Sequence, residues 1–110
     1  MDKKLMSIST SMLILKLLKN QEMYGYQIIK ELENRSENVF VLKEGTLYPI
    51  LHSLEQQEAI ESYEQIAETG RMRKYYRITK VGKKILEEKR KEWNVYQKAV
   101  NKVMGGVQFG

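Results

Sequence analysis

The apolar positions change their spacing along the chain, and each spacing predicts a different element. Residues 7–19 begin with hydroxyl side chains and continue as a nearly unbroken apolar run, which predicts a helix buried on most sides. A second helix opens near Tyr24, and its apolar face is formed by Tyr24, Ile28, Ile29 and Leu32. After a linker at residues 39–42, a third helix is predicted from about residue 45 to residue 57. Its apolar stripe is Leu47, Ile50, Leu51 and Leu54.

Two β-prone runs follow, at residues 60–66 and 72–78, and a polar stretch with one glycine separates them. This pattern predicts a hairpin. Alternation in the second run predicts a basic face, with Arg71, Arg73, Tyr75 and Arg77, and a largely apolar face, with Met72, Lys74, Tyr76 and Ile78. The fold class is therefore mainly α with a small β-hairpin.

Thr79 suits the N-cap of a last helix that is predicted to end near Met104, before two glycines. This helix would be about 40 Å long, too long to pack fully on so small a body. Side chains along it recur with the heptad spacing of paired helices: Leu86, Lys89, Trp93, Tyr96, Val100, Val103 and Val107. We therefore expect a homodimer whose interface contains Leu86, Trp93, Tyr96, Val100, Val103 and Val107.

The composition of the 110 residues fits one compact unit. Because the chain has no cysteine, it has neither disulfides nor thiolate metal ligands. Its N-terminal residues are too polar for a signal peptide and too short for a membrane span, so we expect a cytoplasmic protein that does not contact a membrane. An enzyme would need a nucleophile with its base, a carboxylate pair or a metal cluster. The chain has one histidine, His52, and one aspartate, Asp2, so we expect no catalytic residues, cofactor or metal.

The positive charge is local. Residues 66–91 contain ten Lys or Arg and three Glu, whereas the rest of the chain contains nine basic and eleven acidic residues. Such a cluster is typical of a surface that meets the phosphates of a polyanion. The alternative is a solvated basic helix face.

Three short helices followed by a hairpin form the arrangement of a winged helix-turn-helix, in which the third helix enters the major groove of DNA and the hairpin flanks it. Residues 1–79 would be this DNA-binding domain, and residues 80–110 the dimerisation helix. The expected contacts to double-stranded operator DNA are Gly45, Thr46, Tyr48, Pro49 and His52 on the third helix, and Arg71, Arg73, Lys74 and Tyr75 on the hairpin. An ordinary solvated helix surface is the alternative for the third helix.

Residues 44–51, the pair Leu54-Glu55, residues 70–79 and Gly82 closely resemble the PadR-like transcriptional regulators, as do residues 24–28. The similarity covers roughly residues 5–104. It implies a homodimer that binds DNA through the third helix and the hairpin and represses nearby genes. The short chain resembles the small PadR subfamily with a single long C-terminal helix. Thr69 and Met72 stand where the family usually has a glycine and an arginine, which implies a weaker grip of the hairpin on DNA.

Some drug-responsive members of that subfamily carry a tryptophan on the last helix and bind flat aromatic compounds between two subunits. Trp93 occupies the comparable place, so the resemblance implies a small aromatic effector beside Trp93, Lys89 and Tyr96. The alternative is that Trp93 only packs in the interface. Two other functions remain open from the sequence: a DNA-binding regulator without a ligand, and a protein-interaction module that uses the long helix.

Overall fold

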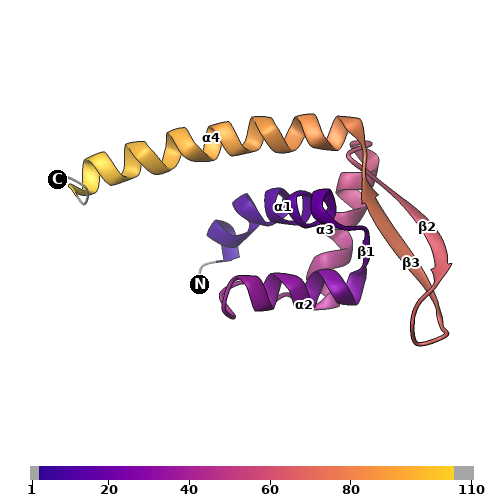
Figure 1. Ribbon diagram of the computed structural model, residues 1–110. Helices are drawn as coiled ribbons and strands as arrows, with labels where there is room; N and C mark the ends of the chain where they lie inside the picture. Colours follow the sequence, from indigo (N-terminus) through magenta and orange to yellow (C-terminus); the bar gives the residue numbers. More distant parts are fainter. Residues whose placement is uncertain (1–2, 106–110) are drawn as a thin grey trace.

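The chain folds into a three-helix body, a small sheet at one edge and a long helix that extends beyond both (Figure 1). The computed structural model describes residues 3–105, and the side chains of residues 9–105. The elements follow in the order α1 (Lys3–Asn20), β1 (Met23–Tyr24), α2 (Gly25–Arg35), α3 (Glu44–Gln56), β2 (Ile60–Ile66), β3 (Met72–Ile78) and α4 (Lys80–Met104). All the predicted helices and both predicted strands are present.

Helix α1 lies at the centre of the body, because its apolar run has neighbours on several sides. It contacts α2, β3 and α4. Its side chains Ile14, Leu15, Leu17 and Leu18 are all buried, as the sequence predicts. The helix begins at Lys3, earlier than the hydroxyl residues suggested.

Strand β1 was not predicted. Met23 pairs with Tyr76 of β3, and Tyr24 pairs with Tyr75, so the hairpin becomes a three-stranded antiparallel sheet in the order β1-β3-β2. Tyr24 was expected on the apolar face of the second helix, but its backbone is extended and it forms the N-cap of α2. Two residues are too short to show an alternating pattern, because this strand depends on its partner β3.

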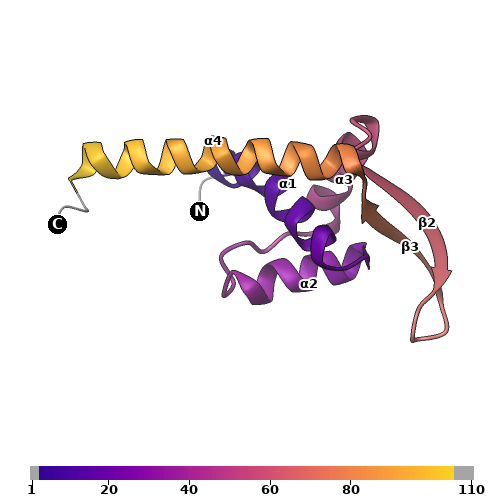
Figure 2. The ribbon, with the colours of Figure 1, turned by 45° about the horizontal axis from the view of Figure 1, so that its top comes forward.

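The hairpin has the predicted bounds, and its turn is closed by a hydrogen bond from the Ala67 N–H to the Arg71 carbonyl. Gly70 takes a positive φ of 84° there, a conformation that costs glycine little. The apolar face predicted for the second strand is buried only in part. Tyr76 is buried, but Met72 and its cross-strand partner Ile66 are 60% and 62% exposed, because the strands run past the body (Figure 2).

Helix α4 begins on the turn that follows α3. The Gly82 N–H donates to the N-cap hydroxyl of Thr79, and that hydroxyl donates to the Glu58 carbonyl. Gly105 ends the helix in the left-handed conformation, as predicted. Leu86 was expected in a dimer interface, but it is only 1% exposed within the single chain and belongs to its core. The predicted interface residue Val107 lies outside the described residues. Within residues 3–105, no helix is long and apolar enough to span a membrane.

Candidate nucleic-acid interface

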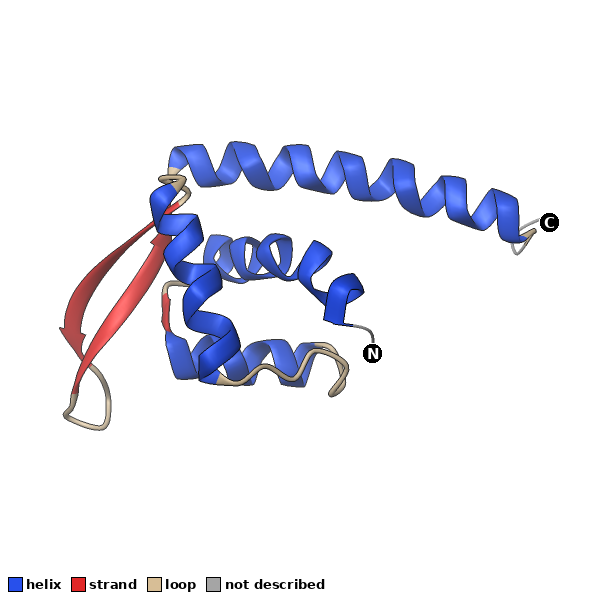
Figure 3. Cartoon of the chain, turned by 180° about the vertical axis from the view of Figure 1, so that it is seen from behind, coloured by secondary structure: helices blue, strands red, loops and turns tan. Residues whose placement is uncertain are grey.

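The outward face of α3 is exposed along its length. Leu47, Leu51 and Leu54 are buried and hold the helix on the body. The five residues expected to contact DNA all lie on the exposed side: Gly45, Thr46, Tyr48, Pro49 and His52. Figure 3 shows α3 on the near side of the body, beside the β2–β3 hairpin. The structure therefore brings one helix face and the hairpin to the same side of the molecule.

Two residues on this face disfavour a helix. Gly45 is the second residue of α3, and a Cβ atom added to it would meet nothing within 4 Å. Pro49 is the sixth residue, so it has no N–H to donate to the Gly45 carbonyl, and its side chain is exposed. Glycine and proline lower helix stability by about 1 and 3 kcal/mol relative to alanine. In the described part of the chain, no atom lies where a side chain at position 45 would be, so packing does not require a glycine there.

The helix itself supplies no cation. Between Glu44 and Gln56 there is no Lys or Arg, and the helix has two carboxylates. Glu55 is turned toward the sheet, because its carboxylate accepts a 3.0 Å hydrogen bond from the Ser62 hydroxyl on β2. Positive charge beside this face comes from the exposed N-cap residue Lys43 and from the neighbouring hairpin.

The hairpin cations fall into two groups. Arg71 and Lys74 are exposed, and neither forms an ion pair with another described residue, although the Lys74 Nζ lies 5.7 Å from the centre of the Tyr76 ring. Arg77 is engaged: its Nε lies 2.8 Å from a Glu61 carboxylate oxygen and its guanidinium carbon 4.9 Å from the centre of the Tyr63 ring. The hydrogen bond to Glu61 raises the pKa of Arg77. Arg71 and Lys74 are therefore the exposed hairpin cations whose charge no described carboxylate neutralises.

Arg73 and Tyr75, both expected at the DNA, lie in a cluster on the outer face of the sheet. The Tyr75 ring meets Tyr24 edge-on at 5.3 Å and stacks on Tyr63 at 5.7 Å. The Arg73 guanidinium carbon is 5.3 Å from the Tyr24 ring centre, and its buried Nε has no hydrogen-bond partner among the described residues. Tyr63 also donates a short hydrogen bond to the Glu22 carboxylate, which raises the pKa of Tyr63. The cluster braces the base of the hairpin against β1.

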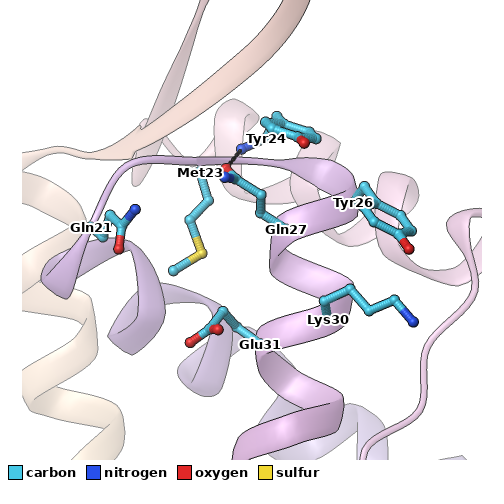
Figure 4. Close-up of a pocket in the computed structure, with 7 residues that line it drawn as sticks. All are labelled: Gln21, Met23, Tyr24, Tyr26, Gln27, Lys30 and Glu31. Carbon is cyan, nitrogen blue, oxygen red and sulfur yellow. Dashed lines mark hydrogen bonds between the residues drawn. The ribbon is translucent and has the colours of Figure 1, made fainter. Parts of the chain in front are cut away.

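The start of α2 borders a shallow hollow of about 270 Å³ (Figure 4). The Gln27 side chain turns back, and its carbonyl oxygen accepts a 3.1 Å hydrogen bond from the Tyr24 N–H. Met23, which is buried, also lines the hollow, together with Lys30 and Glu31.

Trp93 lies between two further hollows, at the middle of α4. Both are lined by Trp93 and by Met12 of α1, and their volumes are about 320 and 370 Å³. The larger one also brings together Lys89 and Tyr96, the other two residues predicted at an effector site. The Trp93 and Tyr96 ring centres are 6.0 Å apart. Sequence reasoning missed Met12, because nothing in the spacing of α1 shows that it faces α4.

A family model decides the class of the protein. The model described as the transcriptional regulator PadR-like family matches residues 14–88. The chain belongs to the PadR-like family. This confirms the predicted family, and it places the protein among transcriptional regulators and not among enzymes.

Individual proteins are similar to this chain over nearly its whole length. An uncharacterized protein from Lysinibacillus sphaericus is 42% identical over 96 residues, 87% of this chain and 88% of that protein. A transcriptional regulator from Clostridium thermocellum is 36% identical, with a TM-score of 0.83 over 91% of this chain and 97% of that one. A PadR-like transcriptional regulator from Bacillus cereus is 28% identical, with a TM-score of 0.83 over 96% of this chain and 100% of that one. The predicted winged helix-turn-helix fold is thereby confirmed.

Proposed function

We propose that this PadR-like regulator is a homodimeric, sequence-specific DNA-binding repressor that a small aromatic molecule releases from its operator. The observation that carries DNA binding is the outward face of α3. At Gly45 an added Cβ would meet nothing within 4 Å, and Pro49 is exposed on the same face, so this part of the helix surface is open to a partner. Glycine is favoured where the backbone must approach a ligand closely. The phosphate backbone and groove of DNA fit that requirement.

The contacts divide between the two elements. The outward face of α3 would read base edges, with Tyr48 and His52 as its largest exposed side chains. Because α3 has no cation, the phosphate contacts are assigned to Arg71 and Lys74 on the hairpin. Arg73 and Tyr75 would support these contacts by keeping the hairpin in place.

The assignment predicts a difference between two arginines of the hairpin. In the Arg71→Ala variant, we expect the affinity for every DNA sequence to fall and the slope of log K against log salt to drop by about one unit. Arg77→Ala is the matched control, because Arg77 is already paired with Glu61, and its slope should change by much less. Fluorescence anisotropy on duplexes selected from a random-sequence pool provides both measurements.

The selection itself tests the function. A regulator with a base-reading helix should enrich one sequence family from the pool, and a protein that is merely basic should not. An unenriched pool would rule out sequence-specific recognition. Equal salt slopes for Arg71→Ala and Arg77→Ala would remove the hairpin cations from the mechanism.

Dimerisation is assigned to the C-terminal half of α4. Past Trp93, the stripe continues as Tyr96, Val100 and Val103, all exposed in the single chain, with Val103 at 87%. Paired stripes of this spacing bury each other in helix dimers. A two-fold dimer would present two copies of α3 to two half-sites of an operator.

The effector is assigned to the hollows beside Trp93. Their volumes reach the lower end of the range for small-molecule sites, and one is lined by Met12 and by the aromatic pair Trp93 and Tyr96. In the dimer, the partner helix would close the open side. Flat apolar molecules would fit because they stack on an indole and bury their own surface.

Trp93 is the one tryptophan of the chain, so its emission reports on this site. We expect anilinonaphthalene sulfonate and quercetin to quench it saturably and to weaken binding to the selected duplex. The Met12→Ala variant should bind these probes several-fold more weakly, because Met12 lines both hollows. Val95→Ala, on an exposed part of α4 away from them, is the control. If neither probe quenches Trp93, or if Met12→Ala and Val95→Ala behave alike, the effector site is not at this place.

A further inference from the structure

Gly25 is in close contact with the side chain of Tyr48. Gly25 is the first residue of α2 and is buried, and Tyr48 is the fifth residue of α3. A Cβ atom built on Gly25 would clash with the Tyr48 hydroxyl and would lie 3.0 Å from Cζ of the ring. The phenol therefore lies directly over the α-carbon of Gly25, in space that every other amino acid would fill.

This contact differs from those of the other glycines in the described chain. At Gly82, an added Cβ would meet the backbone of Ala59, and at Gly45, it would meet nothing within 4 Å. At Gly25, the obstacle is the far end of one side chain, which can swing aside. A methyl group at Gly25 would therefore move Tyr48 and leave the backbone in place.

Tyr48 also lies at the junction of three elements. Its ring, carried by α3, contacts the start of α2 and lies near Tyr76 of β3. Burial raises the pKa of Tyr76 to about 12, and the neighbouring Glu55 and Tyr48 add to this effect. Tyr48 is nevertheless 44% exposed, on the face of α3 assigned to DNA. Its position on that face therefore depends on the space left by Gly25.

We propose that Gly25 is a positioning residue that holds Tyr48 in the place from which it reads DNA, and so sets the sequence preference of α3. This inference rests on the proposed DNA-binding function. Gly25 itself touches no base. It acts by leaving space for the phenol of Tyr48, which is thereby held between α2 and α3. A side chain held in one orientation discriminates between bases better than a mobile one.

A double-mutant cycle on the full chain tests the contact first without DNA. The four proteins are the parent, Gly25→Ala, Tyr48→Ala and the double variant. With Tyr48 present, Gly25→Ala should lower Tm, because the ring loses its packing. Without the ring, the same change should leave Tm unchanged or raise it, because alanine favours a helix over glycine. Gly45→Ala, a change made in open space, is the control that should not lower Tm.

The same four proteins then bind the duplex selected by the parent. Gly25→Ala should weaken this binding about tenfold with Tyr48 present and less than about twofold in the Tyr48→Ala background. A repeated selection with Gly25→Ala should enrich a broader set of sequences, while its affinity for non-specific DNA stays the same.

The outcomes distinguish the proposed DNA-binding function from the proposed role of Gly25. If the parent enriches no sequence, the proposed function fails, but the Tm cycle still reports on the contact. If the parent enriches a sequence and Gly25→Ala loses the same factor in affinity in both backgrounds, Gly25 does not act through Tyr48 and the inference is overturned. It is also overturned if Gly25→Ala keeps the affinity and sequence preference of the parent.

Discussion

A Gly82→Ala variant is expected to lose about 4 kcal/mol of its free energy of unfolding, a large part of the stability of a small domain. The added Cβ would overlap the Ala59 carbonyl oxygen and would lie 2.9 Å from the Ala59 carbonyl carbon and 2.7 Å from Ile78 Cγ1. Backbone atoms surround the position, and the Ala59 carbonyl also accepts a hydrogen bond from the Thr79 N–H. The overlap with the Ala59 backbone cannot be relieved by a side-chain movement, so we expect the start of α4 to be displaced from the body.

Urea denaturation followed by circular dichroism measures this loss. Gly45→Ala is the matched control, and we expect it to be up to about 1 kcal/mol more stable than the parent, because Gly45 is an exposed helical glycine in open space. A Gly82→Ala protein with the stability of the parent would show that α4 does not rest on the turn after α3 as described.

The Val100→Glu variant is expected to be a monomer at concentrations where the parent is a dimer. In a two-fold interface, the substitution places one carboxylate from each chain in the same apolar seam. Burying the two carboxylates without partners costs several kcal/mol, which raises the dimer dissociation constant about a hundredfold or more. Binding to a two-half-site operator should weaken by at least a comparable factor, because the second α3 is no longer linked to the first. Sedimentation velocity and anisotropy measure the two effects.

Val95→Glu makes the same chemical change on the same helix and serves as the control. Val95 is 70% exposed but lies away from the stripe of Trp93, Tyr96, Val100 and Val103, so this variant should stay dimeric. A dimeric Val100→Glu, or a monomeric Val95→Glu, would move the interface to another face. Truncation near residue 84 would be a poor test, because it removes Leu86 from the core of the chain.

The sequence predicted those parts of the fold that have a local cause. The helices follow from apolar spacing and from Thr79 and Gly105 as caps, and the hairpin follows from two β-prone runs around Gly70. The outward face of α3 was also predicted correctly, because the opposite stripe of leucines determines it.

The errors concern contacts between distant segments. Strand β1 exists only through its pairing with Tyr75 and Tyr76, about fifty positions further along the chain. Leu86 has the spacing of the dimer stripe, but the body of the same chain covers it. The contact of Arg73 with Tyr24, which comes from another strand, was likewise not predicted. Heptad spacing and local charge cannot distinguish a partner chain from a distant part of the same chain.

Helix α4 is attached to the body at one end only, so a small rotation at that end produces a larger displacement at the other. Leu86 fixes its first turns in the core, while the part beyond Trp93 extends past the body (Figure 1). The arm from Leu86 to Met104 is about 27 Å long, so a tilt of only about 5° at its base displaces its tip by more than 2 Å. Met12 and Trp93 lie close to this pivot. A molecule that enters the space between Met12 and Trp93 therefore needs to tilt α4 only slightly. In the proposed dimer, such a tilt would change the distance between the two DNA-binding bodies.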